Sequence, residues 1–393
     1  MKKAHHQLAD RTLHLEPEGA YEVLAKAQKM EASGREIIHL EIGQPDFQTF
    51  PNIGMEGIRA ISAGETRYTP SAGIPALKKA IAVNTGARIG MELSPAQVVV
   101  GPGAKPLLFF PMMALLEKGD EVIYPDPGFP SYRAIIETMG ATPVPIALKE
   151  EKDFSFDMDE FNEKINGNTR LIIINPPSNP TGGIIPEEDL HTIADAAKKF
   201  DSWVLSDDIY TQLVYTGEPV KSIMTLPGMK KRTIIMDGFS KTYAMTGWRL
   251  GYGVMPEELA DKVGLLLTHS VGCTAAFTQI AGVEALTGDQ EQVSRVCSTF
   301  RERRDIIVKG MNDIPGVSCS LPKGAFYVFP NIKSFGKSSK EMADYLLEEA
   351  GVALLPGTSF GPMGEGYLRS TFTNSTPAIK KALVLINEAL IKL

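Results

Sequence analysis

The run of four consecutive apolar residues at 171–174 constrains the fold more than any other feature of this chain. A strand without alternating apolar and polar residues is buried on both faces, which is typical of a parallel sheet covered by helices on both sides. Further apolar segments that read as strands lie at 97–100, 121–124, 202–206 and 233–236. Helical segments separate several of these strands, so the sequence predicts an α/β domain with a mostly parallel sheet between about residues 97 and 254.

Ligands of such sheets bind at the carboxyl ends of the strands, so the residues that follow each strand are candidates for a site. The segment after 233–236 is rich in Gly, Ser and Thr and carries Lys241 and, eight residues later, Arg249. A lysine amine in a partly dry pocket near other positive charge loses proton affinity and becomes a nucleophile. Most lysines are solvated, so the alternative for Lys241 taken alone is an ordinary surface side chain.

The segment from Gly238 to Gly251 reads Gly-Phe-Ser-Lys-Thr-Tyr-Ala-Met-Thr-Gly-Trp-Arg-Leu-Gly. It resembles the pyridoxal-phosphate lysine segment of class I/II aminotransferases, the fold type I family that includes aspartate aminotransferase. The resemblance covers nearly the whole chain, with the motifs in the family order. It implies that Lys241 forms a Schiff base with pyridoxal 5'-phosphate, that Arg249 binds the cofactor phosphate and that Ser240 belongs to the cofactor site.

A glycine-rich turn after the strand at 97–100 opens an apolar helix, and the free N–H groups at such a helix start can bind phosphate. The turn lacks the Gly-Lys-Ser/Thr ending of a P-loop, which argues against a kinase or an ATPase. The resemblance implies that Gly103, Ala104 and Lys105 hold the cofactor phosphate, mainly through backbone donors. It also places Phe129 over the cofactor ring, although an aromatic residue after a Pro/Gly turn is often a core residue.

Two more strands end in polar residues that match the family. The Asn-Pro-Thr-Gly sequence after the strand at 171–174 implies that Asn179 bonds the phenolic oxygen of the cofactor, and Tyr210 matches a tyrosine with the same partner. A carboxylate at the end of an apolar strand needs a partner, and the pyridinium nitrogen of the cofactor suits Asp207. Asp208 reads as the neighbour that points away, although the sequence alone leaves the opposite choice open.

Three residues outside the predicted sheet complete the candidate site. Gly43, in a Gly-Gln-Pro-Asp turn, matches a glycine that lies against the substrate carboxylate. Tyr68 matches a tyrosine that crosses a dimer interface to the partner's cofactor phosphate, so the resemblance implies a homodimer with shared active sites. Arg369 matches the arginine that clamps the substrate α-carboxylate, and its fork of donors suits that task. The alternative for Arg369 is a solvated arginine on an edge strand.

Chain length favours more than one domain. Residues 49–288 are expected to form the large cofactor-binding domain, and residues 289–393 a smaller α+β domain. The N-terminal segment 1–48 is expected to join the small domain, as in the family. Short strands are predicted at 37–42 and 317–320, among others in these two regions.

The resemblance implies ping-pong transamination between an α-amino acid and a 2-oxo acid, with Lys241 as proton carrier and Asp207 and Tyr210 as its catalytic partners. Carbon–sulfur β-lyases and other enzymes that act on amino acids share the fold and cofactor residues and stay as alternatives. A cofactor-binding regulator is disfavoured because no DNA-binding extension or basic stretch is present. The region 270–278 has no cation for an acidic side chain, which leaves Lys105 as the candidate.

Bulk composition agrees with a cytoplasmic enzyme. The net charge of −7 argues against a nucleic-acid surface, and no apolar run reaches the roughly 20 residues that span a bilayer. The three cysteines form neither a metal-binding pattern nor a disulfide framework, so reduced thiols and no metal are expected.

Overall fold

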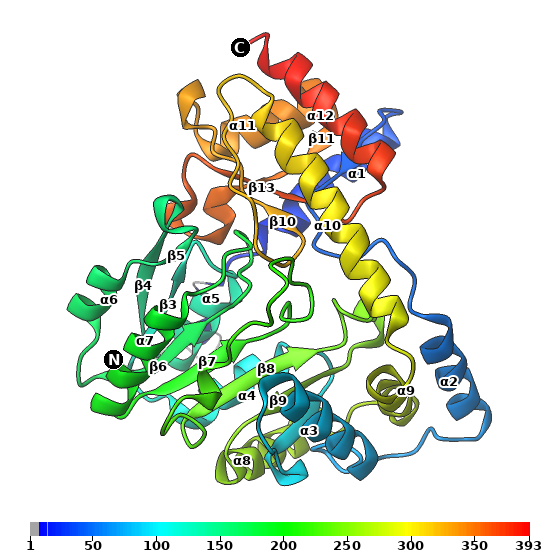
Figure 1. Ribbon diagram of the computed structural model, residues 1–393, viewed down its shortest axis with the longest axis vertical. Helices are drawn as coiled ribbons and strands as arrows, with labels where there is room; N and C mark the ends of the chain where they lie inside the picture. The colour runs from blue at the N-terminus through cyan, green and yellow to red at the C-terminus, as the bar shows by residue number, and fades with distance from the viewer. Residues whose placement is uncertain (1–7, 14) are drawn as a thin grey trace.

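The computed structural model describes residues 8–13 and 15–393. Its centre is an eight-stranded sheet with the strand order β2-β9-β8-β7-β6-β3-β4-β5 (Figure 1). The five strands from β8 to β4 in this order are parallel, while β9 and β5 run antiparallel to their neighbours. The strands are β2 (Val98–Gly101), β3 (Glu121–Asp126), β4 (Thr142–Lys149), β5 (Ser155–Phe156), β6 (Thr169–Ile174), β7 (Trp203–Asp207), β8 (Thr233–Gly238) and β9 (Gly251–Val254). The predicted α/β fold with a mostly parallel sheet is confirmed.

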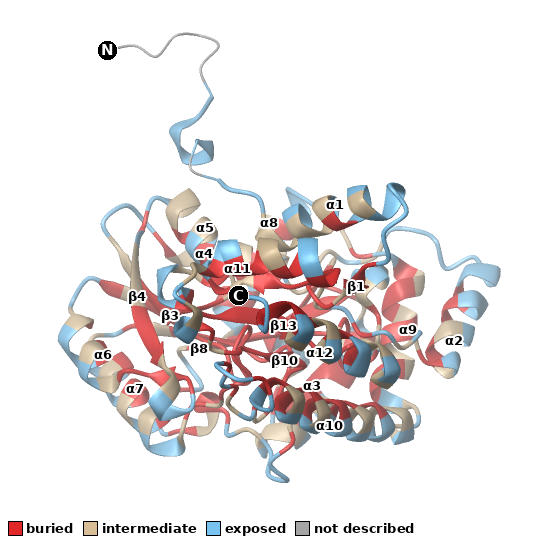
Figure 2. Cartoon of the chain, turned by 90° about the horizontal axis from the view of Figure 1, so that it is seen from above, coloured by how far each residue is buried: buried red, intermediate tan, exposed pale blue. Residues whose placement is uncertain are grey.

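The apolar run in β6 is buried on both faces, as the sequence predicted. Leu171 and Ile173 pack in one apolar cluster with α4, α5 and α8, whereas Ile172 and Ile174 pack in another with α6 and α7. Figure 2 shows the strands buried between helices whose outer faces are exposed. The helices are α3 (Pro75–Ile89), α4 (Pro106–Leu115), α5 (Ser131–Met139), α6 (Met158–Lys164), α7 (Glu187–Lys199), α8 (Glu257–Thr268) and α9 (Ala276–Thr287). Because both layers cover the sheet, polar ligands reach it only at the strand ends.

A smaller α+β region lies beyond these strand ends, at the top of Figure 1. It contains a three-stranded antiparallel sheet with the order β10-β13-β12. The N-terminal β1 pairs in parallel with β11, which supports the prediction that the first segment of the chain joins this region. Its elements are α1 (Gly19–Ala32), β1 (Ile38–His39), α10 (Glu291–Asn312), β10 (Tyr327–Val328), α11 (Ser339–Tyr345), β11 (Val352–Ala353), β12 (Leu355–Pro356), β13 (Leu368–Thr371) and α12 (Thr376–Leu390). The domain boundaries themselves stay a prediction.

Two predicted strands are shorter than expected. The strand predicted at 37–42 is limited to β1, because the Leu40 carbonyl already accepts from Thr371 of β13 and the chain then turns toward the large sheet. The strand predicted at 317–320 is reduced to an isolated bridge. There the side chain of Asn312 bonds both the N–H and the carbonyl of Cys319, at 2.8 and 2.9 Å, and so replaces a strand partner.

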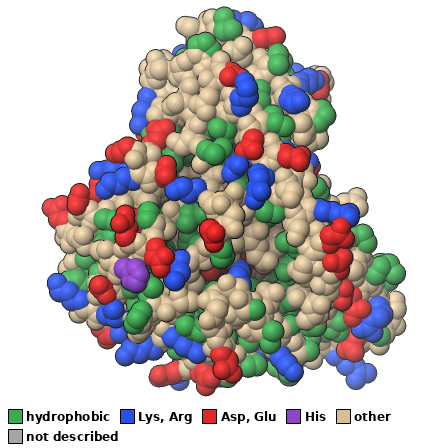
Figure 3. Space-filling model, in the orientation of Figure 1, with side chains coloured by type: hydrophobic (Ala, Val, Ile, Leu, Met, Phe, Trp, Pro, Cys, Tyr) green, Lys and Arg blue, Asp and Glu red, His purple; other side chains and the backbone are tan. Residues whose placement is uncertain are grey.

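The described part of the chain contains no helix that is both long and apolar enough to cross a membrane. On the face shown in Figure 3, acidic and basic side chains are intermixed around a central hollow. The three cysteines are free thiols.

Candidate active site

The candidate residues from β6, β7 and β8 meet at one edge of the large sheet. β7 ends at Asp207, β8 ends at Gly238 three residues before Lys241, and the two strands are parallel neighbours with Asp207 opposite Met236. Because parallel strands end at the same edge of a sheet, this topology places a carboxylate and an amine on adjacent strand ends.

Lys241, which follows β8 of the large sheet, contacts residues of the N-terminal segment and of the smaller α+β region. Its Nζ donates a hydrogen bond of 2.6 Å to the carbonyl of Gly43 and lies 5.7 Å from the ring centroid of Phe326. Burial, reinforced by the positive charges of Arg369 and Arg249, lowers the pKa of Lys241 to about 8. About a tenth of this amine is therefore unprotonated at pH 7, far more than for an ordinary lysine, and the unprotonated amine is the state that a nucleophile needs.

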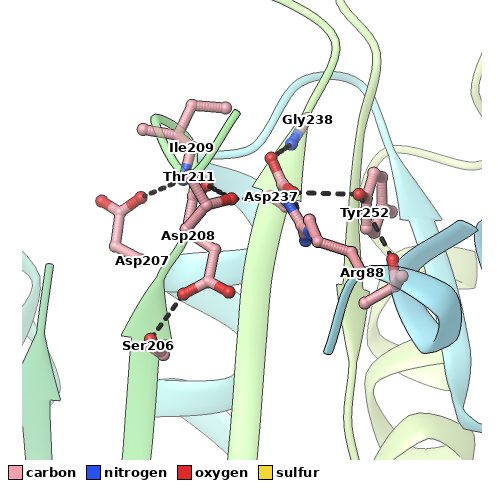
Figure 4. A network of polar contacts seen from close by, with 10 residues as sticks. Arg88, Ser206, Asp207, Asp208, Ile209, Thr211, Asp237, Gly238 and Tyr252 are labelled. Atoms are coloured by element: carbon pink, nitrogen blue, oxygen red, sulfur yellow. Dashed lines mark hydrogen bonds and ion pairs between the residues drawn. The ribbon is translucent and has the colours of Figure 1, made fainter. Parts of the chain in front are cut away.

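Asp207 and Asp208, between which the sequence left the choice open, face different partners. The Asp207 carboxylate accepts a 2.7 Å hydrogen bond from the hydroxyl of Tyr132, and Lys241 is the cation that acts on it. Asp208 instead accepts a 2.5 Å hydrogen bond from the hydroxyl of Ser206 (Figure 4). Burial raises the pKa of Asp208, and the positive charge of Arg88 opposes that rise. Burial raises the pKa of Asp207 to about 7 against the effect of the Tyr132 hydrogen bond. A cation beside Asp207 would therefore stabilise its ionised form.

Tyr210 reaches the site in contact with a second tyrosine. Its hydroxyl lies 2.7 Å from that of Tyr327, and the two rings meet edge to face at 5.6 Å. Burial raises the pKa of Tyr210 well above its usual value, so its hydroxyl stays protonated and can donate. Gly43 is packed against this pair, because a β-carbon there would collide with the Tyr327 hydroxyl.

Arg369 is buried, so the alternative of a solvated arginine on an edge strand is wrong. It lies on β13, the middle strand of the small sheet, and is 3% exposed. Its guanidinium carbon lies 4.6 and 5.2 Å from the ring centroids of Tyr327 and Phe360, and Nη2 donates to the carbonyl of Glu41. Its buried Nε has no hydrogen-bond partner. A buried guanidinium with an unused donor suits a carboxylate ligand.

The turn after β2 lies against Arg249. Gly103 has a φ of 97°, and a β-carbon there would collide with Nη2 of Arg249. The other terminal nitrogen of Arg249, Nη1, donates a 2.8 Å hydrogen bond to the carbonyl of Thr246. The Gly251 backbone is equally close to Ala104. Lys105 forms an ion pair with Glu18, so its ammonium already has a partner. Backbone N–H groups of this turn and the Arg249 guanidinium therefore form a cationic cradle for an anion.

The remaining predicted residues line the same strand ends. Asn179 is 7% exposed, and its side-chain oxygen has no hydrogen-bond partner, while its backbone N–H bonds the side chain of Asn175 at 2.9 Å. Phe129 packs edge-on against Tyr132 at 5.7 Å and lies 5.2 Å below the Lys105 ammonium. Ser240 is buried directly before Lys241. Asn179 follows β6, Phe129 follows β3 and Ser240 follows β8, so all three lie near the carboxyl ends of strands in the large sheet.

Comparisons with known proteins identify the family. The family model "Aminotransferase class I and II" matches residues 35–386. The chain belongs to this family. The curated aspartate aminotransferase of Pyrococcus horikoshii is 40% identical over 99% of this chain and 98% of its own length. The aromatic-amino-acid aminotransferase 2 of Thermococcus litoralis is 36% identical over 96% of both chains. A solved aspartate aminotransferase from Rhizobium meliloti superposes with a TM-score of 0.94 at 34% identity, over 98% of this chain and 99% of that one.

The aminotransferase moves amino groups between amino acids and 2-oxo acids with pyridoxal 5'-phosphate as cofactor. The site fits this cofactor. The cradle at Gly103 and Arg249 suits a phosphate, the Lys241 amine suits an aldehyde, and the buried carboxylate of Asp207 suits a protonated ring nitrogen. The unpaired oxygen of Asn179 offers a further polar contact.

Tyr68 is the predicted residue that this aminotransferase does not bring to the site within one chain. Its side chain is 97% exposed, which is the state expected of a residue that acts on a second subunit.

Sequence reasoning missed two tyrosines that touch the predicted residues. Tyr132 bonds Asp207, and Tyr327 touches Tyr210, Gly43 and Arg369. Tyr132 lies three residues after Phe129 at the start of α5, so helical spacing could have suggested it. No spacing links Tyr327 to Tyr210, because they are 117 residues apart.

Proposed function

We propose that Lys241 is the catalytic base and cofactor-binding lysine of this aminotransferase, that Asp207 pairs with the cofactor ring nitrogen and that Arg369 binds the substrate α-carboxylate. The observation that carries the proposal is the half-buried amine of Lys241 on the strand end next to that of the buried Asp207, where desolvation and the positive charges of Arg369 and Arg249 lower its pKa. Few lysines combine these features unless they react.

Bound pyridoxal phosphate supplies an aldehyde that joins amines and a ring that withdraws electrons from the substrate α-carbon. Nζ of Lys241 would remove the proton from that carbon and deliver it to the C4′ carbon of the bound cofactor, so that the amino group stays with the cofactor. The ionised Asp207 keeps the ring nitrogen protonated, and the hydroxyl of Tyr210 donates to the ring oxygen together with Asn179. Gly103, Ala104, Ser240 and Arg249 hold the phosphate, Phe129 covers the ring and Gly43 lies against the substrate carboxylate.

We propose aspartate as an amino donor. Several aminotransferases that resemble the chain are named for aspartate, although others are named for aromatic amino acids. Lys105 is the candidate contact for the distal carboxylate, since its ammonium lies above Phe129 and is held only by the exposed ion pair with Glu18. Exposed ion pairs are weak, so a substrate carboxylate can displace Glu18 at small cost.

A homodimer with shared active sites is also part of the proposal, with Tyr68 of each subunit reaching the cofactor phosphate of the other. A cytoplasmic location is proposed on the ground of the free thiols, and the division into segments 1–48, 49–288 and 289–393 on the pairing of β1 with β11.

The decisive experiment is the visible spectrum of the cofactor-loaded protein with single amino acids and no oxo acid. Aspartate is expected to convert the cofactor to its amino form in one turnover, and added 2-oxo acid is expected to reverse the change. Lys241→Ala is expected to remove the absorbance of the lysine-linked cofactor, while Lys262→Ala, at an exposed position of α8, is expected to leave the spectrum unchanged. Steady release of ammonia without an oxo acid, or an unchanged band in Lys241→Ala, would contradict the proposal.

A further inference from the structure

A second charged group, the pair of Arg88 with Asp237, lies close enough to Asp207 to act on it. Arg88, near the end of α3, pairs with Asp237 of β8, with 2.8 Å between Nη2 and Oδ2 (Figure 4). The Asp237 carboxylate also accepts from the Tyr252 hydroxyl at 3.0 Å and from the backbone N–H of Gly238 at 2.6 Å. This pair therefore sits at the end of the strand that leads into Lys241.

The same guanidinium also reaches the end of β7. Nη1 of Arg88 donates to the hydroxyl of Thr211, which in turn donates to the carbonyl of Asp208 at 2.8 Å. The N–H of Asp208 donates to Met236 of β8 at 2.8 Å. Arg88 thus joins the ends of the two strands that carry Asp207 and Lys241.

The guanidinium of Arg88 lies among buried carboxylates. Asp207, Asp208 and Asp237 are all at most 4% exposed, and among their described neighbours Arg88 is the cation that acts on both Asp208 and Asp237. Burial raises the pKa of Asp207, and the negative charge of Asp237 adds to this effect. Burial also raises the pKa of Asp237, and the charge of Arg88 opposes that rise. Loss of Arg88 would leave a buried carboxylate unpaired beside Asp207, which is costly in a dry environment.

We infer that Arg88 is a positioning residue of the active site: it cancels the charge of Asp237, joins the ends of β7 and β8, and so holds Asp207 as the carboxylate that faces the cofactor. The inference rests on the role proposed for Asp207. The groups that face Arg88 and Asp237 from other elements are Tyr252 on β9, Asp208 after β7 and Tyr243 after β8. Asp237 and Asp208 are the acidic groups on which the Arg88 charge acts, and the phenols of Tyr252 and Tyr243 stay protonated because burial raises their pKa values.

The test measures the affinity of apo protein for pyridoxal phosphate across pH 5.5–9, together with the pH profile of kcat/KM. In Arg88→Met, the fall of cofactor affinity and of kcat/KM on the acid side, the acid limb of each profile, is expected to occur about one pH unit higher than in wild type, because the charge of Asp237 is no longer balanced. At pH 7 the cofactor is therefore expected to bind roughly tenfold more weakly. The double variant Arg88→Met/Asp237→Asn removes both charges and is expected to restore the limb. Arg88→Lys keeps the charge and is expected to restore most of it.

The single variant Asp237→Asn is expected to shift the acid side of both pH profiles in the direction opposite to that of Arg88→Met. Removing the negative charge while Arg88 stays is expected to shift the acid limb to lower pH, and this test does not depend on the stability of Arg88→Met. A change in melting temperature without a shift of the limb, or a defect in Arg88→Met that the double variant does not repair, would show a purely structural role and overturn the inference.

Asp207→Asn separates this inference from the proposed function. If Asp207→Asn loses activity while Arg88→Met keeps the wild-type profiles, the inference fails and the proposed function stands. If Asp207→Asn retains wild-type turnover, the role of Asp207 fails and the inference fails with it.

Discussion

Burial gives the charged side chains of the site their chemistry. Lys241 and Asp207 have pKa values displaced toward each other, to about 8 and about 7, because both groups are removed from water. In water the amine would be protonated and the carboxylate fully ionised near neutral pH. At the residue scale, reactivity therefore depends on the environment that the fold creates around ordinary side chains.

Arg369 is predicted to supply most of the affinity for the α-carboxylate. Arg369→Ala is expected to weaken the binding of amino-acid donors by about 3 kcal/mol, or roughly 150-fold, because a desolvated charged partner is lost. The dissociation constant for aspartate, measured from the spectral change of the cofactor, checks this expectation. Arg295→Ala serves as the control, since this arginine is 72% exposed and lies on α10. Equal affinities in wild type and Arg369→Ala would rule out the clamp.

Asp207 is predicted to make the apo protein less stable as pH rises. Its pKa is about 7 in the folded protein and near 4 in the unfolded chain, so the folded state holds its proton longer. Stability from this group is full below pH 4 and is lost as pH rises through 7, by about 2–3 kcal/mol between pH 5 and 8. Urea unfolding of apo wild type and Asp207→Asn at both pH values measures the difference, and Asp207→Asn should lack this part of the decline. Parallel curves for the two proteins would contradict the raised pKa.

At the scale of elements, the site depends on how the turn after β2 approaches the loop after β8. Only glycine fits at Gly103, which combines a φ of 97° with direct contact to Arg249, and Gly251 makes a similar approach to Ala104. The phosphate cradle is therefore made by backbone proximity between two loops.

Gly103→Ala is predicted to weaken pyridoxal-phosphate binding at least about tenfold, because the added methyl group would displace the Arg249 guanidinium and strain the turn. Equilibrium dialysis of the apo protein measures this change. Gly140→Ala is the matched control: its φ is 79°, it ends α5, and a β-carbon there meets no atom within 4 Å. It should cost only about 1 kcal/mol of stability and leave cofactor affinity intact. Similar affinities in the two variants would argue against the cradle.

At the scale of the whole molecule, one chain does not contain every predicted cofactor contact. Tyr68 is 97% exposed, and the cavity of about 940 Å³ beside Arg249 is open and lined by residues of the 273–278 segment. The proposed dimer is the arrangement in which Tyr68 would act on the partner's cofactor site.

The protein is predicted to sediment as a dimer of about twice 42.7 kDa. Tyr68→Phe is expected to keep the dimer but to weaken cofactor binding roughly tenfold, the cost of one hydrogen bond to a charged group. Tyr21→Phe, on α1 and 64% exposed, is the control and should change neither property. Cofactor binding that is independent of Tyr68, or a monomer with full activity, would refute shared active sites.

The sequence by itself predicted the fold class, which the structure confirms, and the residues proposed for the site. Periodicity alone predicted β6 as a strand buried on both faces, and the residues after the strands were candidates because parallel strands end at one edge. The roles of Lys241, Asn179 and Arg369 came from motifs whose order matched a family, a kind of information that composition and spacing do not contain.

Only the tertiary structure decided which groups touch. It separated Asp207 from Asp208 through their partners Tyr132 and Ser206, brought Tyr327 to Tyr210, and paired Arg88 with Asp237. Strand ends far apart in sequence are adjacent because hydrogen-bonded neighbours in a parallel sheet are joined by long crossovers. Burial then sets the proton affinities of these groups, and burial depends on the packing of the whole chain.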